Sequence, residues 1–125
     1  MNIPSELKYT KEHEWVRIES KIATIGVTDY AQAELTDITF FELPEIGREV
    51  KQSEEIGVIE TSKAVSEIYS PISGKIVEIN SALDDAPDTL NSDPYGAGWL
   101  VKIEISDEAE VDHLLSADAY KELTE

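Results

Sequence analysis

The chain of 125 residues contains no cysteine, one methionine and only two histidines. Without cysteine, the protein has neither a disulfide framework nor a thiolate nucleophile. Neither His13 nor His113 has a cysteine or histidine neighbour at the spacing of a zinc site. We therefore expect a structural or surface role for both histidines, and no metal site.

Basic residues are also scarce, since 10 lysines and arginines stand against 27 aspartates and glutamates, a formal net charge of −17. Phosphate groups are bound by clustered lysine and arginine, so nucleic acid and anionic membranes are poor partners. No apolar run approaches the roughly 20 residues of a membrane-spanning helix. The segment Met1–Trp15 has the composition of neither a signal peptide nor a transit peptide, and we expect a cytoplasmic protein.

Familiar enzyme motifs are missing as well. The sequence contains no nucleophile elbow, no phosphate-binding loop and no dinucleotide fingerprint. The acidic loop Asp84–Asp93 lacks the spaced ligands and the closing glutamate of a calcium loop. Abundant carboxylates allow an acid–base pair almost anywhere, so they indicate nothing by themselves. These absences favour a binding or carrier protein over an enzyme.

What the chain does contain is a series of short strand patterns between turn signals, which predicts one mainly β domain over residues 1–125, with short helices. We expect strands at Glu14–Glu19, Lys21–Val27, Asp37–Pro44, Glu55–Glu60, Val65–Ser70, Lys75–Asn80 and Trp99–Ile105. In the last strand, alternation predicts that Trp99, Val101, Ile103 and Ile105 share one face. The two β-rich halves weakly indicate two similar sheets joined at a hairpin.

Helices are expected at two places. Asp29, with Gln32 three residues later, predicts a capping box for a short helix at Thr28–Leu35. A long loop is expected at Asp84–Gly98. The tail is predicted to be helical from Asp107, with Glu110 completing a capping box, and a further N-cap is expected at Ser116.

The stretch "ETSKAV" interrupts the strands near the middle of the chain. Two antiparallel strands on either side of it place Thr61–Ala64 in a hairpin turn, with Lys63 in solvent. Taken alone, an exposed lysine on a hairpin is a solvated surface residue. A chain with so few basic residues nevertheless places one at this tip.

Several long segments of the chain indicate a specific role for this lysine. In their order and spacing they resemble the proteins of the glycine cleavage system H protein family, which are lipoyl carriers. The segments are "KYTKEHEWV" (8–16), "IGVTDYAQAELTDITFFELPEIG" (25–47), "ETSKAVSEIYSPISGKIVEIN" (60–80) and "NSDPYGAGWLVKI" (91–103). The resemblance implies a barrel-sandwich hybrid fold with the lipoyl-lysine on a hairpin and a C-terminal helix. It also implies that lipoate is attached by an amide to Lys63.

The resemblance carries further expectations about residues. The modifying enzyme, a lipoate ligase or a lipoyl/octanoyl transferase, is expected to recognise Glu60 and Gly74. Ser62 stands where the family commonly has valine. The family's docking cleft for the arm implies Glu12, His13, Glu14 and Glu67 as contacts, since a carboxylate suits an aminomethyl ammonium. The assignment of these four residues to the cleft is a hypothesis.

The expected partners follow from the same resemblance. They are the pyridoxal-phosphate-dependent glycine decarboxylase, the aminomethyltransferase and dihydrolipoyl dehydrogenase. The arm supplies the chemistry and the protein supplies its position. The expected function is therefore that of a lipoyl-carrying shuttle that moves the aminomethyl group and then the dihydrolipoyl arm between these enzymes.

Other readings remain open. A biotin carrier usually flanks its lysine with methionines, whereas Lys63 lies between Ser62 and Ala64. A lipoyl domain of a 2-oxoacid dehydrogenase usually reads Asp-Lys-Ala and is smaller. An H-like protein that relays lipoate to other enzymes needs the same lysine, and a purely structural module predicts no modification at all.

Overall fold

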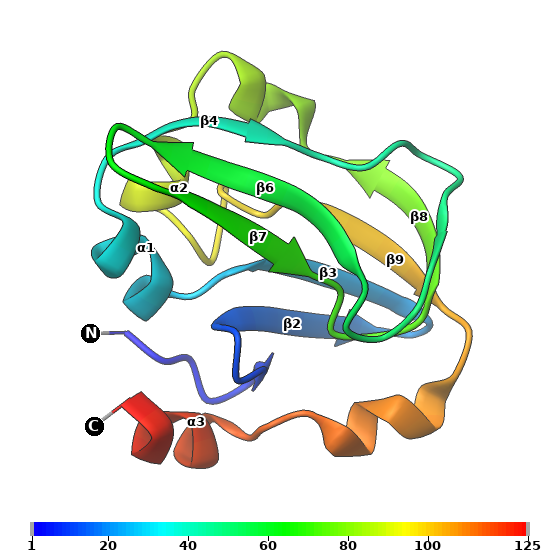
Figure 1. Cartoon of the computed structure of the whole chain (residues 1–125). Helices are drawn as coiled ribbons and strands as arrows, with labels where there is room; N and C mark the ends of the chain where they lie inside the picture. Colours follow the sequence, from blue (N-terminus) through cyan, green and yellow to red (C-terminus); the bar gives the residue numbers. More distant parts are fainter. Residues whose placement is uncertain (1, 125) are drawn as a thin grey trace.

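The computed structural model describes residues 2–124, and over these residues the chain forms two antiparallel sheets (Figure 1). The large sheet has the order β1 (Lys8–Tyr9), β2 (Glu14–Glu19), β3 (Ile22–Val27), β9 (Val101–Ile105), β8 (Gly74–Ile79), β5 (Glu49–Val50). The small sheet has the order β4 (Ile38–Glu42), β6 (Glu55–Thr61), β7 (Val65–Tyr69). The predicted mainly β architecture is confirmed, and each predicted strand exists with shifts of at most two residues at its ends.

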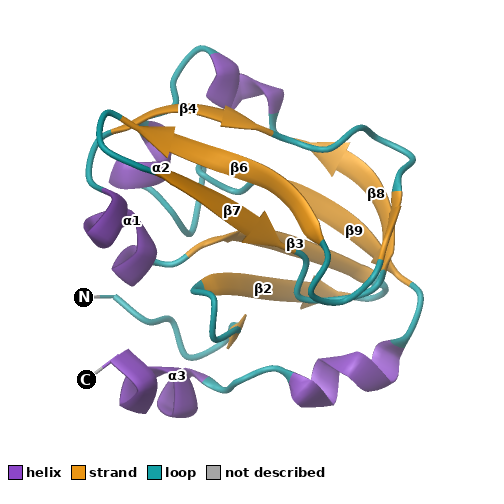
Figure 2. Ribbon diagram, viewed as in Figure 1, coloured by secondary structure: helices purple, strands orange, loops and turns teal. Residues whose placement is uncertain are grey.

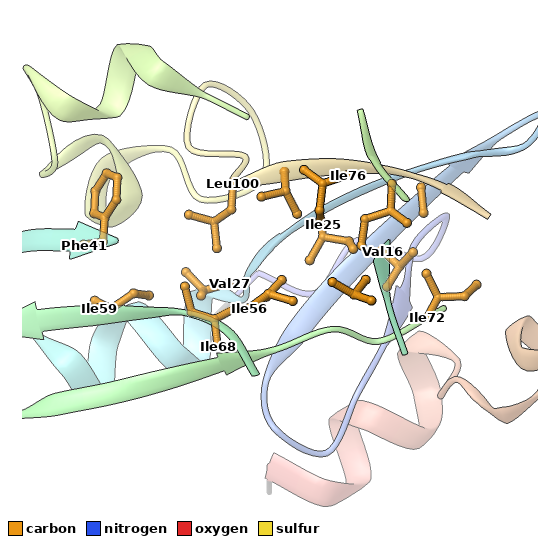
Figure 3. Packing of buried hydrophobic residues seen from close by; sticks show 14 of the residues in the cluster. Val16, Ile25, Val27, Phe41, Ile56, Ile59, Ile68, Ile72, Ile76 and Leu100 are labelled. Atoms are coloured by element: carbon orange, nitrogen blue, oxygen red, sulfur yellow. The ribbon is translucent and has the colours of Figure 1, made fainter. Parts of the chain in front are cut away.

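The main core lies between the two sheets, because each contributes an inward row of aliphatic side chains (Figure 3). Ile56, Ile59 and Ile68 of the small sheet face Ile25 and Ile76 of the large one, and all five are buried. Burial of an aliphatic side chain of this size contributes about 1.5–3 kcal/mol. Figure 2 shows the helices on the outside of the two sheets, so the sheets pack directly on each other.

A second cluster lies on the other face of the large sheet. Trp15 of β2 is buried there together with Leu7, Tyr9 and Tyr120. Both faces of β2 are therefore covered at this point. The expectation that Trp99 shares a face with the inward residues of β9 is wrong, because Trp99 precedes the strand and packs against this second cluster.

The first helix, α1 (Asp29–Leu35), is where the sequence predicts it, but its cap differs. Thr28 is the N-cap, and its hydroxyl accepts the backbone N–H of Ala31 (3.2 Å). Asp29 instead accepts the side-chain amide of Gln32 (2.7 Å). The prediction of Asp29 as the capping residue is wrong by one position, because the buried Thr28 hydroxyl satisfies the helix amide.

The predicted loop at Asp84–Gly98 is partly wrong. It contains a short helix, α2 (Thr89–Ser92), and follows a 3-10 helix, η1 (Ser81–Asp84). Leu83 and Leu90 are buried in the main core, and their burial fixes these turns despite a loop-like composition.

The tail contains a 3-10 helix, η2 (Glu108–His113), and an α-helix, α3 (Ala117–Thr124). Asp107 caps η2 by accepting the N–H of Ala109 (3.1 Å). The second half of the predicted capping box is wrong, because Glu110 accepts hydrogen bonds from the amide (2.7 Å) and hydroxyl (2.8 Å) of Ser73. The predicted N-cap at Ser116 is confirmed, since its hydroxyl accepts the N–H of Ala119 (3.2 Å).

The expectation of two similar sheets, one from each half of the chain, is wrong. The large sheet takes strands from both ends of the chain, and the β6–β7 hairpin lies within the small sheet instead of joining the two. The short edge strands β1 and β5 were not predicted, because two residues are too few to show the alternation of apolar and polar side chains that indicates a strand. No helix within residues 2–124 has the length and apolar character needed to cross a bilayer.

Candidate functional site

The turn of the hairpin that joins β6 and β7 (Figure 1) is closed by hydrogen bonds among its own residues. The hydroxyl of Thr61 accepts hydrogen bonds from the backbone amides of Lys63 (3.2 Å) and Ala64 (3.1 Å). The amide of Thr61 donates in turn to the carbonyl of Ala64 (2.9 Å). Ser62, Lys63 and Ala64 are exposed, so the predicted hairpin with a solvent-facing lysine is confirmed.

Two of the predicted site carboxylates lie in the same small sheet. Glu60 is half-buried in β6, where it pairs with Val65 of β7. Glu67 is exposed in β7, where it pairs with Val58. Residues that pair across strands share a face, so both carboxylates stand on the face opposite to the core.

Gly74 has a different environment, because it is buried at the start of β8 in the large sheet. A Cβ at this position would collide with the backbone carbonyl of Glu104 and approach Cγ2 of Ile103 to 2.6 Å. The position admits only glycine on packing grounds. Gly74 therefore presents no side chain that a modifying enzyme could read directly.

A cleft of about 210 Å³ opens at the end of β7 that is remote from the hairpin tip. Its walls come from the turn before β2, the turn before β6, the end of β7 and the tail between η2 and α3. The lining includes Tyr9, Glu12, Glu14, Tyr69, His113 and Leu115. Leu115 is held there by two backbone hydrogen bonds with Tyr9, each 2.8 Å long.

Glu14 is the buried charge of this cleft, with a relative exposure of 3%. Its carboxylate accepts the hydroxyl of Thr10 (2.8 Å) and the backbone N–H of Tyr69 (3.2 Å). Burial raises the pKa of Glu14 to about 7, with a smaller contribution from Glu12, while the two hydrogen bonds act in the opposite direction. A cation that enters the cleft therefore stabilises the ionised form of Glu14.

His13 points away from the cleft. Its backbone is in the left-handed region (φ 69°), and its Nδ1 lies 2.8 Å from the hydroxyl of Tyr120. The same hydroxyl lies 2.7 Å from that of Thr28, the N-cap of α1. Burial lowers the pKa of His13 and raises that of Tyr120 to about 12. This network ties the turn that bears Glu14 to α1 and α3.

The predicted arm-docking residues thus lie in three environments. Glu12 and Glu14 line the cleft. His13 lies outside the cleft and contacts the hydroxyl of Tyr120, and Glu67 is exposed on β7. Glu67 is also the first cause of the raised pKa of Tyr69, a cleft residue. The sequence reasoning missed Tyr69 and Thr10, which bind the carboxylate of Glu14.

No group of three or more histidine, cysteine, aspartate or glutamate side chains within residues 2–124 is placed to hold a metal ion. The site therefore consists of two parts, an exposed lysine on a self-contained hairpin and a cleft with one buried carboxylate. Two antiparallel sheets packed face to face, with such a lysine at one hairpin tip, define the barrel-sandwich class of carrier domains.

Comparison with known proteins specifies the family. A sequence model described as "Glycine cleavage H-protein" matches residues 7–125. The chain is 53% identical to the glycine cleavage system H protein of Symbiobacterium thermophilum, over 98% of this chain and 96% of that one. It is 56% identical to the protein of the same description from Staphylococcus epidermidis, over 98% of both chains.

A solved structure agrees with these sequence matches. The crystal structure of a glycine cleavage system H protein from Mycobacterium marinum superposes with a TM-score of 0.89 at 38% identity, and the match covers 98% of both chains. The chain belongs to the glycine cleavage H-protein family. Its fold is that of a barrel-sandwich lipoyl carrier, as the family resemblance implied, and its role lies in the glycine cleavage system.

Proposed function

We propose that this protein is the lipoyl-carrying shuttle of the glycine cleavage system, with the arm attached to Lys63. In this role it moves an aminomethyl group from glycine decarboxylase to the aminomethyltransferase, and then presents the reduced arm to dihydrolipoyl dehydrogenase. The observation that carries the proposal is the exposed Lys63 at the tip of a hairpin whose turn is closed by hydrogen bonds to the Thr61 hydroxyl.

The surroundings of Lys63 fit a lipoyl group. Its neighbours Ser62 and Ala64 are small and exposed, so a modifying enzyme can reach the lysine amine. Amide formation removes the charge of the lysine and leaves a long flexible arm. The bound lipoyl group supplies thiol–disulfide chemistry, and the hairpin supplies its position.

The cleft offers a place for the cargo. Glu14 is desolvated and held in one orientation by Thr10 and Tyr69, so it is preorganised to pair with an ammonium group. The entry of an ammonium favours loss of the Glu14 proton, because an opposite charge stabilises the carboxylate. Glu12 adds negative charge to the same wall. We assign Glu14 the role of holding the cargo amine out of bulk water.

Modification of the purified protein tests the attachment site. The unmodified chain is incubated with a lipoate ligase, ATP and lipoate, and intact mass is followed by peptide mapping. We expect a gain of one lipoyl amide at Lys63 and no gain in Lys63→Arg. Lys75→Arg, at another exposed lysine, is the matched control and should be modified like the wild type.

Transfer is tested with the modified protein. Together with glycine decarboxylase, glycine and pyridoxal phosphate, it should accept the aminomethyl group, whereas the unmodified protein should not. A folded wild-type chain that gains no mass with an active ligase would overturn the proposal, as would a modified chain that accepts no aminomethyl group.

A further inference from the structure

The last helix, α3, has a single buried side chain among its described residues, that of Tyr120. Its ring stacks on the ring of Tyr9, with the ring centroids 4.7 Å apart and an angle of 12° between the planes. Figure 1 shows α3 beside the N-terminal segment that leads into β1. Because Tyr9 lines the cleft that contains Glu14, the ring of Tyr120 supports one wall of this cleft.

The hydroxyl of Tyr120 makes separate contacts, at 2.8 Å from Nδ1 of His13 and at 2.7 Å from the hydroxyl of Thr28. Burial lowers the pKa of His13, against a smaller opposite effect of Glu12 and Glu34, so the imidazole is neutral near pH 7. Every hydroxyl proton has an acceptor when Thr28 donates to Tyr120 and Tyr120 donates to Nδ1. The hydroxyl of Tyr120 thus joins the turn before β2 to the N-cap of α1.

His13 needs such contacts, because its backbone adopts a conformation that is rare for residues other than glycine. Its φ of 69° lies in the left-handed region, and a strained residue of this kind persists only where its surroundings hold it. The ring of Tyr30 lies 4.5 Å from that of His13, and the amide of Thr28 donates to the His13 carbonyl (3.1 Å). The Tyr120 hydroxyl is the third of these contacts.

The conformation of His13 matters because the next residue is Glu14. The amide of His13 donates to the carbonyl of Thr10 (3.2 Å), and the amide of Glu14 donates to the hydroxyl of Thr10 (3.2 Å). The same hydroxyl donates to the Glu14 carboxylate (2.8 Å). Thr10, His13 and Glu14 are therefore linked in one turn, so a change in the backbone of His13 redirects the carboxylate.

We infer that the hydroxyl of Tyr120 is a positioning group for the cleft: by holding His13 in its left-handed conformation, it keeps the Glu14 carboxylate desolvated and directed at the cargo amine. Tyr120 does not line the cleft, so it acts through the turn and not by contact with the cargo. The inference rests on the proposed role of Glu14, and it adds a residue of the last helix to that role.

Tyr120→Phe separates the two parts of this side chain, because it keeps the stacked ring and removes the hydroxyl. Tyr95→Phe is the matched control. The Tyr95 hydroxyl also makes two hydrogen bonds, since it accepts the N–H of Asp29 (3.0 Å) and donates to the carbonyl of Asn2 (2.6 Å). Tyr95 packs against the same second cluster but does not line the cleft. The two substitutions therefore remove similar bonds, one linked to Glu14 and one not.

The first measurement is an NMR titration of the Glu14 carboxyl carbon in the full chain without a lipoyl group. Burial is the main cause of the raised pKa of Glu14, so a loosened turn that admits water should lower this pKa. We expect it to fall from about 7 to about 6 in Tyr120→Phe and to stay near the wild-type value in Tyr95→Phe. The other groups around the carboxylate are unchanged in both variants, and they are Thr10, Glu12 and Tyr69.

This readout distinguishes positioning from anchoring. A variant that only lowers the free energy of unfolding leaves the pKa of Glu14 in the folded chain unchanged. Unfolding midpoints are compared for every variant, and the titration is performed where each chain is folded.

Substitutions of His13 keep the test valid if Tyr120→Phe folds poorly. In His13→Asn, Oδ1 is as many bonds from the backbone as Nδ1 and can accept the Tyr120 proton, and asparagine tolerates the left-handed region. His13→Ala offers neither property. We expect the pKa of Glu14 to stay near the wild-type value in His13→Asn and to fall in His13→Ala. Both variants lack the imidazole, so its charge does not explain a difference between them.

The second measurement is the lifetime of the aminomethylated arm in the modified protein. Water that reaches the aminomethyl group releases formaldehyde and ammonium and leaves a free thiol, and formaldehyde is the readout. We expect release to be about fivefold faster in Tyr120→Phe, as for the loss of one hydrogen bond, and within about twofold of the wild type in Tyr95→Phe. Glu14→Gln, which removes the charge itself, should release formaldehyde at least as fast as Tyr120→Phe.

The outcomes separate this inference from the proposed function. An unchanged pKa of Glu14 in Tyr120→Phe and His13→Ala would overturn the positioning role, as would an equal decrease in Tyr95→Phe. If this pKa falls as expected but neither Tyr120→Phe nor Glu14→Gln shortens the lifetime of the arm, Tyr120 positions Glu14 and the proposed role of Glu14 toward the cargo fails.

Discussion

The hairpin tip and the Glu14 cleft lie at opposite ends of β7, and they are built in different ways. The tip is closed by Thr61 with bonds to residues two and three positions away. The cleft combines Glu14, Tyr69 and Leu115, which are far apart in sequence. The proposed attachment point is thus a turn closed by local hydrogen bonds, while the proposed resting place of the arm depends on contacts between distant parts of the chain.

The first way to test this comparison is to damage the fold at a site remote from the tip. In Gly74→Ala, the new Cβ meets the Glu104 carbonyl of the neighbouring strand β9, and we expect a loss of about 4 kcal/mol in the free energy of unfolding. Urea unfolding measures this loss. Gly47→Ala is the control, since Gly47 has a positive φ of 97° but open surroundings, and it should cost about 1 kcal/mol.

If Gly74→Ala destabilises the protein no more than Gly47→Ala does, the large sheet is more tolerant than its packing indicates. Modification of Lys63 should decrease in Gly74→Ala only under conditions that unfold the chain. A folded Gly74→Ala variant that is no longer lipoylated would instead mean that Gly74 is recognised directly.

The second prediction concerns the buried carboxylate of the cleft. Because the folded-state pKa of Glu14 is about 7 against 4.5 in the unfolded chain, the folded state retains a proton between these values. The free energy of unfolding should therefore fall as pH rises through this window, by about 3 kcal/mol relative to Glu14→Gln, which cannot ionise. Urea unfolding of both proteins from pH 4 to pH 8 measures the difference.

A matched control for this experiment is Glu12→Gln, at an exposed carboxylate on the same wall. Its stability should show most of the wild-type decrease over the same pH range, because Glu12 is only a smaller cause of the raised pKa of Glu14. Parallel curves for the wild type and Glu14→Gln would show that Glu14 is solvated, and the cleft would then lose its preorganised charge.

The smallest effect is expected at the tip. Thr61→Val removes the acceptor of the Lys63 and Ala64 amides, but both amides can turn to water. We expect a loss of about 0.5–1 kcal/mol in global stability, together with faster hydrogen exchange of these two amides. Thr39→Val, on the neighbouring strand β4, is the control and should leave their exchange unchanged. Unchanged exchange in Thr61→Val would mean that the turn is held by the strands alone.

The same contrast explains what the sequence could predict. The hairpin was predictable because its signals lie within a few residues, two strand patterns around "TSKA". Glu14 and Glu12 were reached through family resemblance, not through pattern. Thr10 and Tyr69, which fix the orientation of Glu14, have no local signal, because their contacts exist only after β2 and β7 have packed.

Errors in the predicted fold have the same origin. The N-cap of α1 is Thr28 and not the predicted Asp29, because the Thr28 hydroxyl is buried against Tyr120, a residue of the last helix. Trp99 does not share the inward face of β9, because it packs against the second apolar cluster, which Leu7 and Tyr9 form on the other side of the sheet. Local alternation predicts a strand, but it does not predict which of two buried faces receives the residue before it.

The position of Tyr120 and Leu115 near the end of the chain has a consequence for the order of events during synthesis. Chains emerge from the ribosome N-terminus first, and segments fold as they become available. All three strands of the small sheet, and Lys63 with them, are made before residue 70. The wall formed by Leu115 and the support given by Tyr120 come about fifty residues later. A nascent chain therefore displays Lys63, the proposed attachment lysine, before the cleft that we propose for the cargo is complete.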